Sequence, residues 1–239
     1  MPSPSYHLRC LRHERLARGV YEFTLERPEA MQFKAGQFVL FDVALIDNPA
    51  DIQTRAFSIA SSPLEEKELL FLAKMKEGGR ASRWIEEVLK AGSSVRTQGP
   101  FGNFILDATT DKEYLFIATG SGVAPFRSHV LTALKNGDKR RMDLIFGVRS
   151  EEDLFWKKEF EELAQTYENF YVHFALSGPM EGWTGHKGRV QTLVPLIVED
   201  FSRKCVYVCG SPDMTKELKT ICLEQWGMER KDLHVEGYI

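Results

Sequence analysis

The run EYLFIATGSGVAP, residues 113–125, decides the fold of the second half of this chain. It opens with a nearly continuous apolar stretch, which is typical of a strand covered on both faces in a parallel sheet. Glycines and a proline follow, and Phe126, Val130 and Leu134 then share one face of a helix. Strand, glycine turn and helix in this order favour a nucleotide-phosphate site, because free backbone amides and the helix dipole attract a pyrophosphate. The spelling G-x-G-x-x-P departs from the usual G-x-G-x-x-G fingerprint.

The alternation of strands and helices continues to the end of the chain. Further strands are expected at residues 142–148, 170–176, 204–209 and 233–236. The helices between them include one starting at a Ser150/Asp153 capping box, one within residues 185–198 broken at Pro195, and one opening at Pro212. This alternation predicts a doubly wound parallel sheet of about five strands. Ligands bind at the carboxyl ends of such strands, where Arg149, Ser177 and Cys209 stand.

The first half of the chain shows a different pattern. Short β-rich runs at residues 21–26, 37–43, 69–75 and 94–98 are separated by turn residues. Their spacing favours a small antiparallel barrel or sandwich. Residues 45–53 are expected to form an exposed loop, and one helix is predicted over residues 81–89 with Gly92 as its C-terminal cap.

The polar stretch at residues 107–112 separates the two halves. We therefore predict an N-terminal antiparallel β-barrel domain at residues 1–107. A C-terminal α/β domain with a doubly wound parallel sheet is predicted at residues 112–239.

The composition narrows the class of protein. The net charge of the 239 residues is −3 and the charges are well mixed, so a surface for nucleic acid is not indicated. No apolar run approaches the roughly 20 residues of a membrane helix. No signal-type segment opens the chain, so a cytoplasmic protein is expected. The four cysteines and six histidines lack the spacing of a metal or iron–sulfur site, so no metal is predicted.

Two short segments of the first half carry candidate binding groups. In Arg55-Ala56-Phe57-Ser58, strand alternation places Arg55 and Phe57 on one face and Ser58 on the other. A charge, a flat ring and a hydroxyl so close together suit a cofactor with a phosphate and a ring. The segment Gly79-Arg80-Ala81-Ser82 stands at the start of the predicted helix, where free amides attract an anion. A surface arginine beside a core phenylalanine, and a turn without a ligand, remain the alternatives.

A β domain followed by a nucleotide-binding α/β domain, with these motifs in this order, resembles the ferredoxin–NADP reductase family over nearly the whole chain. The resemblance implies that Arg55 pairs with the pyrophosphate of FAD and that Phe57 packs on the isoalloxazine. It also implies that Ser58 donates a hydrogen bond near flavin N5. Residues 79–82 look like the family's second phosphate-binding turn.

Motifs of the second half complete the resemblance. The segment Gly120-Ser121-Gly122-Val123-Ala124-Pro125 fits the family's nicotinamide-nucleotide turn. Cys209-Gly210-Ser211-Pro212 resembles the C-G-x-P segment, whose cysteine approaches nicotinamide C4. The end of the chain resembles a terminus whose aromatic residue, here Tyr238, covers the other face of the flavin. Ser58, Cys209 and Glu236 are then expected around the meeting point of N5 and C4, although packing in the β core is an open alternative for Cys209.

The resemblance implies an enzyme that passes hydride from NAD(P)H to FAD and then single electrons to a separate carrier such as ferredoxin or flavodoxin. The reductase component of an oxygenase, a free-flavin reductase and a non-catalytic nucleotide-sensing subunit are the alternatives. Arg149, helped by Lys187 and Arg189, could hold a 2′-phosphate. Ser177-Gly178 replaces the Ser-Arg pair that NADP-binding members often carry, which favours the absence of a strong 2′-phosphate clamp.

Overall fold

The computed structural model describes residues 4–178 and 181–238. The chain divides into two compact units. The N-terminal unit comprises Met1–Leu106 with Arg127–Thr132, and the C-terminal unit comprises Asp107–Phe126 with Ala133–Ile239. Within the described residues, no helix is long and apolar enough to cross a membrane. The same residues hold no group of three or more histidine, cysteine or acidic side chains that could bind a metal ion.

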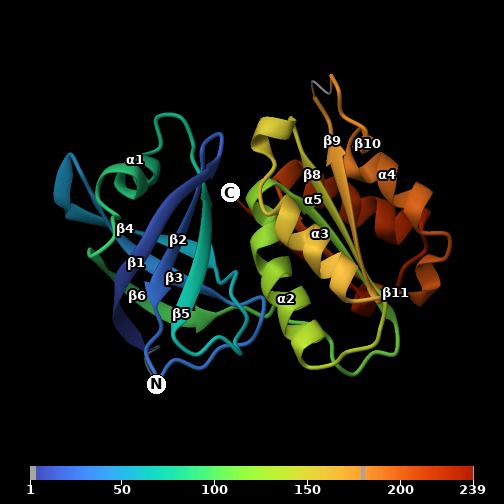
Figure 1. Ribbon diagram of the computed structural model, residues 1–239, viewed down its shortest axis with the longest axis horizontal. Coiled ribbons are helices and arrows are strands. Elements are labelled where there is room, and N and C mark those ends of the chain that lie inside the picture. Colours follow the sequence, from blue (N-terminus) through green and yellow to red (C-terminus); the bar gives the residue numbers. More distant parts are fainter. Residues whose placement is uncertain (1–3, 179–180, 239) are drawn as a thin grey trace. The chain divides into compact units, whose positions relative to one another are not determined.

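The N-terminal unit is built on one antiparallel sheet that curls into a half-barrel (Figure 1). Its strands are β1 (Ser5–Ala17), β2 (Val20–Glu26), β3 (Phe38–Leu45), β4 (Asn48–Ser58), β5 (Glu68–Lys74) and β6 (Ser94–Phe101), in the order β4-β3-β6-β1-β2-β5. The inner face is aromatic: the Phe23 ring lies 5.8 Å from Phe41 and 5.6 Å from Phe71, and all three side chains are fully buried. Helix α1 (Arg80–Glu87) completes this unit with its buried residues Trp84 and Ile85.

Strand β4 corrects the prediction of a loop at residues 45–53. Those residues form the end of β3, a two-residue turn at 46–47 and the first half of β4, with Ala44 opposite Ile52 and Leu45 opposite Asn48. The pattern escaped detection because β4 is an edge strand with most of its side chains exposed, so it lacks apolar alternation. Pro49 is tolerated there because an edge strand has an unpaired side.

Two further boundaries in the N-terminal unit differ from the predictions. Strand β1 was not predicted, because irregularities in its pairing with β2 between Cys10 and Arg12 and again near its end interrupt the period of two. Helix α1 ends at Glu87 with Val88 as its C-terminal cap, so the prediction that Gly92 caps the helix is wrong.

The C-terminal unit is a parallel sheet with helices on both faces, as predicted (Figure 1). Its strands are β7 (Glu113–Thr119), β8 (Met142–Val148), β9 (Phe170–Leu176), β10 (His186–Lys187), β11 (Lys204–Gly210) and β12 (Leu233–Gly237), in the order β10-β9-β8-β7-β11-β12. The main helices are α2 (Ala124–Lys135), α3 (Lys157–Thr166), α4 (Val190–Ile197) and α5 (Pro212–Thr220). Apolar side chains of α4 and α5 form one cluster with those of β7 and β11.

Three details of this unit differ from the sequence predictions. The sheet has six strands rather than about five, because the two-residue strand β10 pairs with β9. Helix α4 continues through Pro195 and is not broken there. The predicted Ser150/Asp153 capping box forms, but it caps a single 3-10 turn, and α3 starts only at Lys157.

Candidate functional site

The predicted flavin segment lies on the exposed edge strand of the N-terminal half-barrel. Arg55 stands opposite Phe41, and Phe57 stands opposite Val39, so both side chains share one face of β4. The Arg55 side chain is exposed and donates hydrogen bonds to its neighbours Thr54 and Gln53 on the same strand. An edge strand without a covering layer leaves room for a ligand beside an arginine, which fits the pyrophosphate of FAD.

Phe57 and Ser58 occupy the transition from this exposed strand to the core. The Phe57 ring lies 4.8 Å from the ring of Phe41 and 5.7 Å from the ring of Phe23, and its side chain is half-buried. Much of the ring therefore packs in the half-barrel, and only part of it is available to a flavin. Ser58 is buried at the end of β4, whereas Ala56 is exposed.

The predicted second phosphate turn lies next to the same strand. Gly79 precedes α1, and no side chain caps the helix there, so the first amides of the helix are not satisfied by a capping group. A side chain at Gly79 would bring its Cβ within 2.8 Å of the Ser82 hydroxyl oxygen. The Arg80 guanidinium lies 3.7 Å from a carboxylate oxygen of Asp51 on β4. The two predicted flavin segments are thus neighbours in one unit, as a cofactor that contacts both requires.

Arg27 is a residue of this region that the sequence did not single out. Its guanidinium donates hydrogen bonds to the carbonyl oxygens of Met31, Pro63 and Glu65 and lies over the ring of Phe33. It therefore fixes the backbone that follows Ser58. No sequence motif indicates that Arg27 binds this backbone segment, because its acceptors are main-chain carbonyl groups.

The predicted nucleotide turn is the 3-10 helix Gly120–Val123 between β7 and α2. Gly120 has a φ of +54°, which favours glycine. A Cβ on Gly122 would lie 2.4 Å from the Cys209 carbonyl oxygen and 2.6 Å from the Gly210 Cα. The turn therefore lies directly against the backbone of β11. Val123 and Pro125 are buried and shape the turn, while Ser121 is half-buried.

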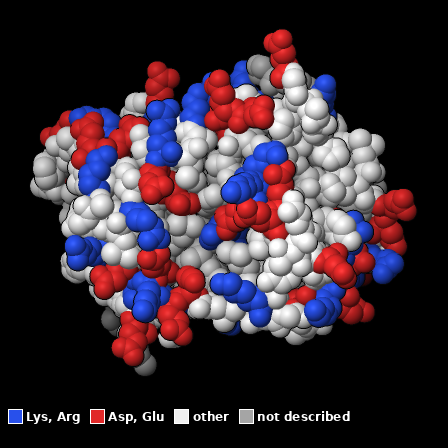
Figure 2. All heavy atoms as spheres, viewed as in Figure 1, with Lys and Arg blue, Asp and Glu red and all other residues white. Residues whose placement is uncertain are grey.

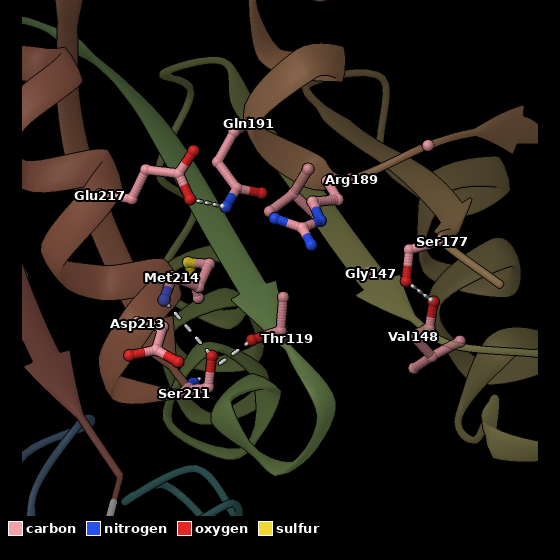
Figure 3. A pocket seen from close by; sticks show the side chains of 12 residues that line it. Thr119, Gly147, Val148, Ser177, Arg189, Gln191, Ser211, Asp213, Met214 and Glu217 are labelled. Carbon is pink, nitrogen blue, oxygen red and sulfur yellow. Dashed lines mark hydrogen bonds between the residues drawn. The ribbon is translucent and has the colours of Figure 1, made fainter.

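A pocket of about 300 Å³ opens at the carboxyl ends of the parallel strands (Figure 3). It is lined by Thr119, Gly147, Val148, Ser177, Gly188, Arg189, Val190, Gln191, Ser211, Asp213, Met214 and Glu217. Ser177 was predicted for this place, and its hydroxyl donates to the Val148 carbonyl oxygen at 3.3 Å. The other predicted side chain, Arg149, follows β8 and is exposed, and the pocket lining does not include it.

The charged side chains of the pocket were mostly missed by sequence reasoning. Arg189 received only a supporting role, and Asp213 and Glu217 were not named. The acidic pair stands at i and i+4 on α5, directly after the end of β11. The rule that ligands bind at the carboxyl ends of strands would have drawn attention to this first part of α5.

Cys209, Glu236 and Tyr238 meet at the carboxyl end of β11. Cys209 stands directly opposite Glu236 on β12, and the Tyr238 amide donates to the Gly210 carbonyl oxygen at 2.8 Å. Burial raises the pKa of the Cys209 thiol well above its usual value, and the charge of Glu236 adds to this, while a hydrogen bond with Tyr238 opposes it. The thiol is therefore protonated at neutral pH, and its side chain is fully buried. Ser58 belongs to the other unit, and its predicted place beside these residues stays a prediction.

Two family models match this chain. An oxidoreductase FAD-binding domain matches residues 13–105, and an oxidoreductase NAD-binding domain matches residues 116–220. Among solved structures, the cytochrome P450 reductase GcoB of Amycolatopsis is 27% identical with a TM-score of 0.87, and the match covers 98% of this chain and 70% of that one. A ferredoxin NADP+ reductase from Neisseria gonorrhoeae, 20% identical with a TM-score of 0.83, shares the fold over 98% of each chain.

Curated relatives extend over nearly the whole chain. Ferredoxin–NADP reductase B of Sorangium cellulosum is 32% identical over 227 residues, which is 92% of this chain and 91% of the relative. The phenol 2-monooxygenase reductase component DmpP of Pseudomonas sp. is 34% identical over 217 residues. That match covers 90% of this chain but 59% of the relative, so the chain spans little more than half of that protein.

These matches confirm the fold class and the two cofactors that the sequence motifs indicated. The matched FAD-binding domain contains Arg55. The matched NAD-binding domain contains the Gly120–Val123 turn. The chain therefore belongs to the ferredoxin–NADP reductase family and is a flavin-dependent NAD(P)H reductase.

Proposed function

We propose that this reductase passes electrons from NAD(P)H, through FAD, to a separate one-electron carrier such as ferredoxin or flavodoxin. The observation that carries the proposal is the mutual coverage with ferredoxin–NADP reductase B, which is 92% of this chain and 91% of the relative. The reductase component of an oxygenase is the second candidate. It is supported by the 34% identity to a phenol 2-monooxygenase reductase component.

The residues of the N-terminal unit hold the cofactor in this proposal. Arg55 pairs with the pyrophosphate, and the backbone amides after Gly79, which no side chain caps, take the second phosphate contact. Phe57 presents the exposed part of its ring to the flavin, and Ser58 donates a hydrogen bond near it. FAD, when bound, accepts two electrons as a hydride and releases them singly.

The residues of the C-terminal unit hold the nicotinamide nucleotide. The amides of the Gly120–Val123 turn bind its pyrophosphate, and the pocket beyond Thr119 takes the adenosine half. Cys209 and Glu236 line the end of β11 where we place the nicotinamide. Because the Cys209 thiol is protonated, it orients the ring by contact and takes no proton from it.

Flavin-loaded protein, mixed anaerobically with NADH or NADPH in a stopped-flow instrument, is expected to lose its flavin absorbance rapidly. The reduced protein is then mixed with oxidised ferredoxin, flavodoxin, free FMN or an oxygenase component. Fast reoxidation by ferredoxin or flavodoxin alone supports the first candidate. Fast reoxidation only by the oxygenase component supports the second. A flavin that neither nucleotide reduces contradicts both and leaves a nucleotide-sensing subunit.

Replacing Tyr238 by alanine should tighten binding of the oxidised nicotinamide nucleotide by about tenfold, because the nucleotide no longer has to displace a docked residue from the end of β11. The hydrogen bond from the Tyr238 backbone amide to the Gly210 carbonyl oxygen supports this assignment, because it holds the residue at the end of β11. Calorimetric titration with NAD+ measures the change. Tyr238→Phe, which keeps the ring, is the matched control and should bind like the wild type. Equal affinity of the alanine variant and the wild type would rule out displacement.

A further inference from the structure

The nucleotide pocket has a wall rich in hydrogen-bond acceptors. Its ionisable lining residues are one cation, Arg189 on the N-terminal side of α4, and two carboxylates, Asp213 and Glu217 on α5. All three side chains are exposed to solvent at the pocket mouth. The acidic side chains therefore outnumber the basic one among the residues that line the cavity.

Glu217 is held in place by a neutral side chain from the neighbouring helix. The Gln191 amide nitrogen donates to the Glu217 carboxylate at 2.8 Å, and both side chains lie at the pocket (Figure 3). The Gln191 amide nitrogen has two donor hydrogens, and one of them is committed to Glu217. The Gln191 carbonyl oxygen and the Glu217 carboxylate are acceptors, so the pair offers mainly acceptors to a ligand.

An acceptor wall discriminates between the two nicotinamide nucleotides. The 2′- and 3′-hydroxyl groups of an adenosine ribose are donors that carboxylate and amide oxygens can bind. A 2′-phosphate has no such donor when ionised and carries close to two negative charges at neutral pH. It would face two carboxylates and a single arginine. Exposure of the side chains and salt weaken this repulsion without removing it.

We propose that Glu217, positioned by Gln191, is the residue that makes this reductase select NADH over NADPH. The inference rests on the proposed binding of the adenosine half in this pocket, and it adds the identity of the nucleotide and of the discriminating side chain. It also agrees with the position of Arg149, whose side chain is not part of the pocket lining.

The test uses the full-length, flavin-loaded protein and three variants: Glu217→Gln, Glu217→Lys, and the control Glu224→Gln. Glu224 is an exposed carboxylate on the turn after α5 and does not line the pocket. Calorimetric binding of NAD+ and NADP+ is measured first. Flavin reduction by NADH and NADPH then follows in the stopped-flow instrument.

The wild type should bind NAD+ at least about tenfold more tightly than NADP+, and Glu217→Gln should raise the affinity for NADP+ by about fivefold while changing that for NAD+ less than twofold. Glu217→Lys should shift the ratio of NADP+ affinity to NAD+ affinity further toward NADP+, and Glu224→Gln should leave this ratio unchanged. A wild type that prefers NADP+, or Glu217 variants with the same affinity ratio as the wild type, would overturn the inference. Flavin reduction by either nucleotide would in that case still support the proposed reductase. If neither nucleotide binds or reduces the flavin, the proposed function itself fails.

Discussion

Replacing Gly122 by alanine should lower the catalytic efficiency of flavin reduction by NAD(P)H by about 100-fold, because the whole turn has to move away from β11. The added Cβ would lie 2.4 Å from the Cys209 carbonyl oxygen and 2.6 Å from the Gly210 Cα. Both are backbone atoms, so no side-chain rotation can relieve the clash. The amides that we assign to the pyrophosphate shift with the turn. The measurement is the rate of flavin reduction as a function of nucleotide concentration.

The FAD content of the Gly122→Ala protein should be unchanged, since the residues predicted to hold the FAD phosphates, Arg55 and residues 79–82, lie in the other unit. Gly137→Ala is the control for the added methyl group, because Gly137 follows α2 and has no atom within 4 Å of an added Cβ; unlike Gly122, it has a positive φ of 74°. It should lower the free energy of unfolding by about 1 kcal/mol, because an L side chain is strained at this positive φ, and leave the nucleotide kinetics unchanged. Full efficiency in Gly122→Ala would show that the turn does not hold the nucleotide.

The Gly120–Val123 turn could be predicted from the sequence because the residues that form it are adjacent in the chain. Strand, glycines and helix are adjacent in the chain, so the backbone requirement at Gly122 is visible in one short run. The residues of the pocket wall, in contrast, are far apart in the chain. Gln191 and Glu217 come from two different helices and stand 26 residues apart. On each helix alone, such a polar side chain is indistinguishable from an ordinary solvent-facing residue, and only the packing of α4 and α5 on one sheet face brings the two together.

In the half-barrel, the sequence motif was easier to predict than the secondary structure that carries it. The motif at residues 55–58 was recognised, whereas the first half of the strand that carries it was predicted to be a loop. Both results have one cause. A strand exposed along most of its length lacks the apolar alternation that identifies strands, and the same exposure leaves Arg55 accessible to a phosphate. The segment proposed to bind the flavin is therefore one whose strand boundaries the apolar pattern does not reveal.

Replacing Asp143 by asparagine should lower the free energy of unfolding of the C-terminal unit by about 3 kcal/mol at pH 7, because it breaks a buried ionic network. Asp143 is 1% exposed, accepts two hydrogen bonds of 2.9 Å from Arg141, and lies 3.0 Å from the Lys204 ammonium. Lys204 is itself buried and also bonds Glu113 at 2.8 Å. This network could not be predicted from the sequence, because Asp143 and Lys204 lie within strand segments that are otherwise apolar. Urea unfolding followed by tryptophan fluorescence measures the loss.

The pH dependence of this difference identifies the network as its cause. Burial alone would raise the pKa of Asp143, but hydrogen bonds from His173 and Arg141 and the charge of Lys204 outweigh it, and the pKa falls well below its usual value. A carboxylate with a depressed folded-state pKa stabilises the fold above its unfolded pKa, about 3.9, and this contribution is lost as the pH falls toward the folded value. The gap between wild type and Asp143→Asn should therefore be constant from pH 7 to about 5 and shrink below about 4.

Glu161→Gln provides the matched control for this experiment. Glu161 pairs with Lys157 one turn away on α3, and both side chains are more than 40% exposed. Its loss should change the free energy of unfolding by less than about 0.5 kcal/mol at any pH, since exposed pairs are screened and entropically costly to hold. If Asp143→Asn were as mild as this control, or if its effect persisted undiminished at pH 3, the buried charges would not be the source of stability at this end of the sheet. A large loss that disappears on acidification would show that the charge of Asp143, rather than the shape of its side chain, stabilises the unit that presents the nucleotide turn.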